Sequence, residues 1–161
     1  MGYSLFMPRF VSINNKIFII TALSVFGFII YSNTLHCPFQ FDDTLCIVSN
    51  PSIKSLSNLQ SMWIYYPTRL LAFLSFAINY RIGGLDVFSY HIVNLLIHVT
   101  NAFLIWCLTI LTFRTPAIKD NKISKFSYEI AFFSSLIFLS HPVQTESVTY
   151  IWQRTDRKSV V

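Results

Sequence analysis

The sequence is poor in charged residues for its length. Only 12% of its 161 residues are Asp, Glu, Lys or Arg, while hydrophobic residues make up 53% and the mean hydropathy is +0.53. Soluble globular domains are roughly a quarter charged. The composition therefore argues against an ordinary soluble domain and predicts an all-α protein in which about three membrane segments and their loops fill the chain.

Several common signals are missing as well. The sequence has no tandem repeat, low-complexity tract or Gly-rich phosphate loop. Its net charge of +5 is not carried by a basic run interleaved with aromatics, so nucleic acid is not an expected partner. Three cysteines fit neither a zinc site nor a dense disulfide framework, and no metal is expected. Cys37 and Cys46 lie in one polar stretch, where either a disulfide or two free thiols are possible, whereas Cys107 is an apolar filler.

The apolar runs divide the chain into spans and loops. Residues 1–16 form a polar entry, and spans are predicted at residues 17–34, 87–113 and 128–140. A signal peptide is the alternative for the first run, although Ser32-Asn33-Thr34 is a poor cleavage site. Together, residues 17–155 are expected to form a partial polytopic membrane helix bundle.

A loop outside the bilayer is predicted at residues 35–86, where Pro38 and Pro51 interrupt any helix. Within it, residues 66–80 are apolar at the centre, but the charges at Arg69 and Arg81 bracket too few uncharged residues to cross. An interfacial or re-entrant helix is expected there, with a short tilted span as the alternative. Gly83-Gly84 then predicts a turn.

The distribution of basic residues predicts the topology. Arg9 and Lys16 precede the first span, and a second basic group follows the span at 87–113, namely Arg114, Lys119, Lys122 and Lys125. In the loop between these spans, acidic and basic residues balance. The positive-inside rule then places both basic flanks in the cytoplasm and the loop on the other side.

One polar stripe interrupts the second span. His91, Asn94, His98 and Asn101 fall within about 80° of one another on a helix, so the stripe should face the bundle interior or a wet cavity rather than lipid. Interhelical hydrogen bonds that fix packing are one explanation, and a share in a substrate cavity is the other. A histidine metal site is disfavoured, because the i, i+7 spacing is too wide for adjacent ligands.

Two groups of ionisable residues lie outside the predicted spans. Asp42 and Asp43 are flanked by Phe39, Phe41 and Leu45, and such a pair can supply one carboxylate as a base while the other orients or binds. The bland alternative is two solvated loop acids. His141, Glu146 and Arg154 follow the third apolar segment and form either part of a site or a capped interfacial helix.

Four blocks in the same order resemble one known family. They are YSNT (31–34) with FDD (41–43), NYRIGGLD (79–86), YHIVNLLIH (90–98) and HPVQTESV (141–148). These blocks resemble the transmembrane O-mannosyltransferases that carry tetratricopeptide repeats behind a membrane domain, together with their bacterial relatives. The match covers about residues 30 to 155.

The resemblance implies a metal-independent glycosyltransferase of the C-type fold, with a catalytic acid in the first outer loop at Asp42 or Asp43. It implies mannose transfer from a dolichyl or polyprenyl phosphate, a lipid substrate rather than a cofactor, to Ser or Thr of an acceptor protein. The location would be the endoplasmic reticulum membrane in a eukaryote or the plasma membrane in a bacterium. Substrate-binding candidates are Arg69, His91, His98, His141, Glu146 and Arg154.

Three departures from the family pattern are visible. The family usually has arginine or histidine directly before the proline of its short helix, whereas this chain has Tyr66-Pro67-Thr68-Arg69, so a phosphate-facing role of Arg69 is open. The family's later helices and repeats are absent, which predicts an N-terminal fragment without activity of its own. Residues 156–161 read as an artefactual end, because a sequencing adapter encodes these six residues in one frame.

Two classes of function follow. The first is part of an inverting, lipid-dependent glycosyltransferase. The second is a non-catalytic polytopic module for transport or assembly, in which the stripe and the acids serve packing or passage. The acid pair favours the first class, because a packing element has no need of it.

Overall fold

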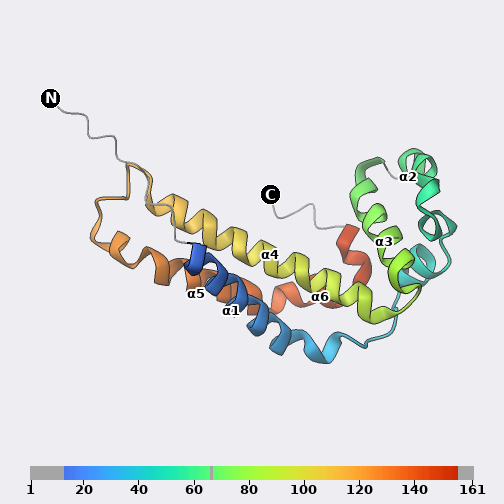
Figure 1. Cartoon of the computed structure of the whole chain (residues 1–161), viewed down its shortest axis with the longest axis horizontal. Coiled ribbons are helices and arrows are strands. Elements are labelled where there is room, and N and C mark those ends of the chain that lie inside the picture. The colour runs from blue at the N-terminus through green and yellow to red at the C-terminus, as the bar shows by residue number, and fades with distance from the viewer. Residues whose placement is uncertain (1–12, 66, 156–161) are drawn as a thin grey trace.

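A computed structural model describes residues 13–65 and 67–155, so the predicted polar entry lies largely, and the predicted artefactual end wholly, outside the described residues. Within these ranges the chain is helical, with no strand, which confirms the all-α class. Helices α1 (Ile13–Tyr31), α4 (Val87–Phe113) and α5 (Ser127–Ser140) run side by side as a rod (Figure 1).

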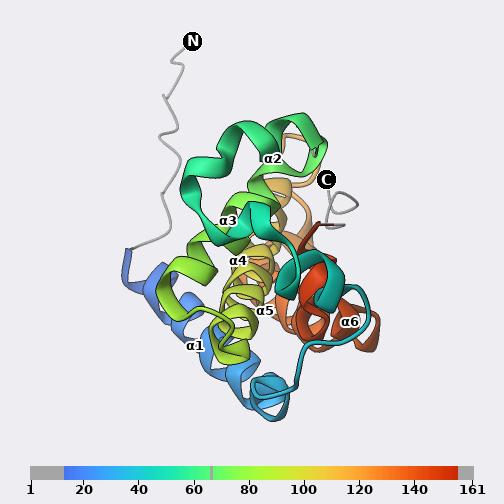
Figure 2. The same cartoon turned by 90° about the vertical axis from the view of Figure 1, so that its right-hand side faces the viewer.

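A lobe covers one end of the rod. It contains the short helices η3 (Pro51–Lys54) and α2 (Leu59–Tyr65), followed by α3 (Leu70–Gly83). The end-on view in Figure 2 shows α2 and α3 in front of α4 and α5, with α6 (Thr145–Thr149) beside them. The helix predicted at residues 66–80 is thus displaced, since it begins at Leu70 after a turn of 3₁₀ helix at Pro67–Arg69 and ends at Gly83.

Local sequence sets the junction between lobe and rod. Gly84 follows α3 with φ of +60°, a left-handed conformation that costs glycine little. The carboxylate of Asp86 then accepts a hydrogen bond from the Phe88 N–H at 3.3 Å and caps the start of α4. The helix after the glycine turn covers the residues of the second predicted span, and its crossing of a membrane stays a prediction.

Close packing of apolar and small residues holds the rod together. Leu23 of α1, Leu95 and Val99 of α4, and Leu139 of α5 form one buried cluster. Gly27 lets α1 approach α4, because a Cβ atom at that position would lie 3.2 Å from Cγ2 of Val99. Small residues at such crossings are typical of helices that pack in lipid.

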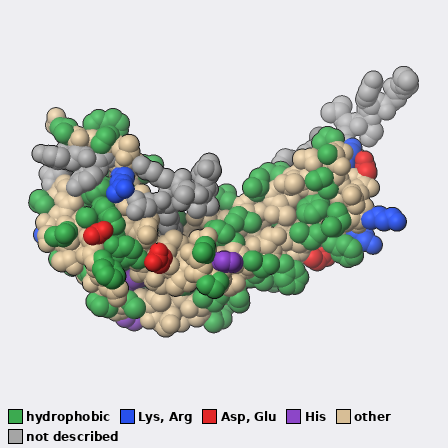
Figure 3. Space-filling model, turned by 180° about the vertical axis from the view of Figure 1, so that it is seen from behind, with side chains coloured by type: hydrophobic (Ala, Val, Ile, Leu, Met, Phe, Trp, Pro, Cys, Tyr) green, Lys and Arg blue, Asp and Glu red, His purple; other side chains and the backbone are tan. Residues whose placement is uncertain are grey.

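The outer surface of the rod stays apolar. Exposed hydrophobic side chains lie along it, and Lys and Arg gather at the end far from the lobe (Figure 3). Two described helices, Ile13–Thr34 and Val87–Phe113, are long and apolar enough to cross a bilayer, so the structure is compatible with membrane insertion. Helix α5 has 14 residues, fewer than the roughly 17 to 25 that a span needs, so the third span remains a prediction.

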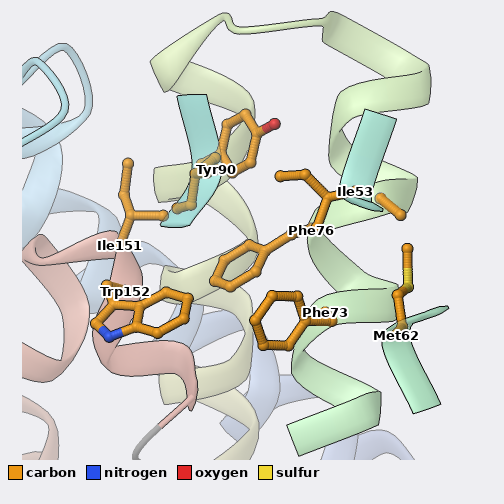
Figure 4. Packing of buried hydrophobic residues seen from close by; sticks show 9 residues of the cluster. Ile53, Met62, Phe73, Phe76, Tyr90, Ile151 and Trp152 are labelled. Carbon is orange, nitrogen blue, oxygen red and sulfur yellow. The ribbon is translucent and has the colours of Figure 1, made fainter. Parts of the chain in front are cut away.

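The lobe has its own aromatic core, to which the end of the described chain contributes. Figure 4 shows Phe73 and Phe76 of α3 with Trp152, which belongs to the 3₁₀ helix η8 (Ile151–Thr155). The Trp152 ring stacks on Phe76 with ring centroids 6.2 Å apart and meets Phe73 edge-on at 5.7 Å. Helix η8 is therefore an integral part of the lobe.

Candidate functional site

The polar stripe of α4 faces the interior, as predicted. His91, Asn94 and His98 are at most 2% exposed, and Asn101 is half-buried. The His98 Nε2 atom lies 3.1 Å from the Leu139 carbonyl oxygen, and the Tyr31 hydroxyl donates to the same oxygen at 3.0 Å. His98 thus joins α4 to α1 and α5, which supports the packing role.

Two other residues of the stripe, His91 and Asn94, contact backbone carbonyls that lie outside the first and third predicted spans. His91 Nε2 lies 3.0 Å from the Cys37 carbonyl oxygen, and because a carbonyl only accepts, Nε2 carries the proton. The buried Nδ1 of His91 has no partner among the described residues. Asn94 Nδ2 donates to the Val148 carbonyl oxygen at 3.2 Å.

Arg154 is the centre of a buried polar network. It is 6% exposed, and its guanidinium lies 4.6 Å from the centroid of the Phe76 ring. The guanidinium donates four hydrogen bonds to helices α3 and α4, which are Nε to Asn94 Oδ1 (2.8 Å), Nη1 to Ser75 Oγ (3.0 Å) and Asn79 Oδ1 (2.7 Å), and Nη2 to the Tyr90 carbonyl oxygen (2.9 Å). Arg154 therefore clamps η8 onto α3 and α4.

The two adjacent acids occupy different environments. Asp43 is 2% exposed, and its carboxylate accepts from the Gln40 N–H at 3.1 Å and from the Trp152 N–H at 2.8 Å. Burial raises the pKa of Asp43 above its ordinary value, and the two backbone hydrogen bonds oppose that rise. The side chain of Asp42 is exposed. Only Asp42 therefore offers its carboxylate to an incoming group.

The turn that carries Asp42 is unusual. Phe41, directly before it, has φ of +46°, which is uncommon for any residue with a side chain and costly for a bulky one. The N–H of Asp42 donates to the Tyr150 hydroxyl at 3.2 Å, and the Phe41 ring meets the Tyr150 ring edge-on at 6.1 Å. Burial, more than any other effect, raises the pKa of Tyr150, so its hydroxyl is protonated at neutral pH.

Two cavities lie on either side of η8. The first, which we call the acidic cavity, has a volume of about 480 Å³ and is lined by Gln40, Asp43, Glu146, Tyr150 and Gln153 among others. The second, the arginine cavity, has a volume of about 450 Å³ and is lined by Trp63, Thr68, Arg69, Arg154 and Thr155 among others. Consecutive residues of η8, Gln153 and Arg154, therefore line different cavities.

Trp152 connects the two cavities. The backbone N–H of Trp152 donates to Asp43, which lines the acidic cavity. The indole ring of Trp152 lies 5.9 Å from the guanidinium of Arg69, which lines the arginine cavity. Two carboxylates, those of Asp43 and Glu146, thus line one cavity, and two guanidinium groups line the other. The arrangement can accept a proton on one side and balance negative charge on the other.

The remaining candidate residues from the sequence do not all lie in one site. Glu146 lines the acidic cavity, whereas His141 lines neither cavity and its Nδ1 accepts from the Val143 N–H at 3.2 Å, a helix cap. Cys37 and Cys46 are free thiols in the structure, so the unpaired alternative holds. Tyr150, Trp152 and Gln153 were missed from the sequence, because an uncharged run beside an apolar helix carries no local sign of a site.

Comparisons with known proteins give one consistent set of relatives. The chain is 32% identical over 152 residues to the protein O-mannosyl-transferase TMTC2 of Mus musculus, a match that covers 83% of the chain and 16% of that protein. It is 31% identical to Tmtc3 of Drosophila melanogaster and 30% identical to TMTC3 of Homo sapiens, in each case over 81% of the chain. The chain thus spans about 16% of the length of the first of these relatives and 14% of the human TMTC3. No family model and no solved structure matches.

Proposed function

Because the chain belongs to the family of the TMTC protein O-mannosyl-transferases, we propose that the full-length protein is an integral membrane glycosyltransferase. It transfers a sugar, which we take to be mannose, from a dolichyl or polyprenyl phosphate to Ser or Thr hydroxyls of an acceptor protein. The observation that supports this most is the division of charge beside η8, with Asp43 and Glu146 lining one cavity and Arg69 and Arg154 lining the other.

Asp42 is the catalytic base in this proposal. Attack of an acceptor hydroxyl on the anomeric carbon forms the new glycosidic bond, and the hydroxyl proton must pass to a carboxylate within hydrogen-bond reach. The exposed side chain of Asp42 is open to such a hydroxyl, whereas Asp43 already accepts two backbone hydrogen bonds. The acidic cavity beside them takes the acceptor segment.

Arg69 is the residue that faces the leaving phosphate. The bond between the anomeric carbon and the phosphate oxygen breaks, the electron pair stays on that oxygen, and the departing lipid phosphate needs a cation rather than a second acid. Arg69 is half-buried beside the arginine cavity. Arg154 lines the same cavity and adds a positive charge at a fixed position, because its hydrogen bonds hold it against helices α3 and α4.

In this proposal the site lies at a membrane surface. Helices α1 and α4, which are long and apolar enough to cross a bilayer, span the membrane, and the lobe with both cavities lies at the water interface, where a lipid phosphate resides. Membrane lipid and an acceptor protein are then the partners. The membrane is that of the endoplasmic reticulum in a eukaryotic host and the plasma membrane in a bacterial one.

Transfer from the donor lipid tests the proposal. We expect Asp42→Asn in the full-length protein to lower the transfer rate by roughly 10² to 10⁴-fold while donor binding persists, because the base is lost but the charge partners of the donor remain. Asp120→Asn, in the exposed loop at the far end of the rod, is the matched control and keeps the wild-type rate. An Asp42→Asn enzyme with near-wild-type transfer would exclude Asp42 as the base. The same result for Asp43→Asn would exclude the acid pair from that role, whereas a full-length wild type that transfers no sugar from the donor lipid would leave the non-catalytic module as the explanation.

A further inference from the structure

We propose that Tyr150 is a positioning residue that holds Asp42 ready to act, through the hydrogen bond from the Asp42 N–H to the Tyr150 hydroxyl. The inference rests on the proposed function of Asp42 as the base. It concerns a residue that lies 108 positions away in the chain and does not touch the reacting atoms.

The backbone before Asp42 needs external support. A phenylalanine with φ of +46° sits in a sparsely populated and strained region, and such a conformation persists only where the surroundings determine it. The Phe41 side chain is 83% exposed, so its burial does not supply the support. The contacts of the following residues must do so.

Two contacts from one segment supply that support. The Tyr150 hydroxyl accepts from the Asp42 N–H at 3.2 Å, and the Trp152 N–H donates to Asp43 Oδ1 at 2.8 Å. One contact holds the main chain of the first acid, and the other holds the side chain of the second. Together they fix both ends of the acid pair against the segment that starts η8.

Tyr150 is itself anchored from the rod. Asn94 Nδ2 lies 3.5 Å from the Tyr150 carbonyl oxygen, at the long limit of a hydrogen bond, and donates to the Val148 carbonyl oxygen at 3.2 Å. Asn94 in turn accepts from Arg154. A continuous chain of contacts therefore runs from the buried stripe of α4 to the turn that presents Asp42.

The two contacts that hold the acid pair differ in what their loss would cost in stability. Asp43 is buried, so its loss would disturb the fold of the lobe as well as the turn. The contact between Asp42 and Tyr150 is exposed, so water can replace the hydroxyl at little cost in stability. What water cannot replace is the fixed direction of the hydrogen bond, and a displacement of about 1 Å in a reacting group can cost roughly 10²-fold in rate.

The test is Tyr150→Phe in the full-length protein, which removes the hydroxyl and keeps the ring against Phe41. We expect kcat for transfer to fall roughly 10 to 10²-fold while KM for the donor lipid changes less than about twofold. Hydrogen exchange in a peptide covering residues 39–44 should become faster, with no change in α4. Tyr128→Phe, on the exposed start of α5, is the matched control and should alter neither measurement.

The Tyr150→Phe test and the Asp42→Asn test have outcomes that can be told apart. If Asp42→Asn abolishes transfer but Tyr150→Phe keeps the wild-type kcat, Tyr150 does not position the base, although the proposed function stands. A fall in thermal stability together with parallel changes in kcat and KM would also overturn the inference, because it marks a structural role. If Asp42→Asn keeps full transfer, Asp42 is not the base, and the positioning role of Tyr150 fails with it.

Discussion

Loss of the Arg154 guanidinium should loosen the lobe from the rod. In Arg154→Met, the buried oxygens of Asn94, Asn79 and Tyr90 each lose the donor described above. A buried acceptor that loses its donor costs about 1 to 3 kcal/mol. The Tyr90 carbonyl keeps its intrahelical bond in α4, so the two amide oxygens alone sum to roughly 2 to 6 kcal/mol.

The expected value lies in the lower half of that range. Removing the guanidinium also removes the cost of burying a charge, and a methionine of similar length keeps part of the packing on Phe76. We therefore expect a destabilisation of about 3 kcal/mol, which corresponds to a local opening constant roughly 10²-fold larger. The destabilisation in Arg154→Lys should lie between zero and that of Arg154→Met, because one ammonium cannot reach the four acceptors that the planar guanidinium binds.

Hydrogen exchange of the full-length protein measures this opening locally. Peptides covering η8 and α3 should exchange roughly 10²-fold faster in Arg154→Met, while those covering α5 stay unchanged. Arg81→Met is the matched control, since Arg81 is exposed on α3 in the same lobe, and it should leave exchange near the wild-type rate. An Arg154→Met protein whose η8 exchanges within about threefold of wild type would refute the clamp.

Two further predictions concern Asp43 and the topology. Burial raises the pKa of folded Asp43 above its ordinary value of 3.8, so the stability that this group contributes is complete below about pH 3.8 and is lost as the pH rises through the folded-state pKa. The melting temperature of the wild type should therefore fall relative to that of Asp43→Asn between pH 4 and 7, and a constant or growing advantage of the wild type would contradict this. Cysteine labelling of full-length variants should find Ser55→Cys accessible from outside the cytoplasm and Lys119→Cys from within it, because the basic flanks stay inside, and the reverse pattern would exclude this orientation.

Local pattern was enough to predict much of the helical framework. Low charge and long apolar runs predicted the all-α class, and Gly83-Gly84 marked the turn between α3 and α4. The 3.6-residue period of the helix placed His91, Asn94 and His98 on one buried face. Each of these inferences needs only neighbours within a few residues, which is the range over which helix geometry is fixed.

The division of roles within the candidate site depended on tertiary structure. Asp42 and Asp43 are adjacent and chemically alike, so no local pattern separates an exposed acid from a buried one that binds the Trp152 N–H. Arg154 likewise reads as a surface cation until its partners, 60 to 79 positions earlier, enclose it. Those contacts exist because α3, α4 and η8 pack around one aromatic core, and the free energy of that packing belongs to the assembled lobe rather than to any one segment.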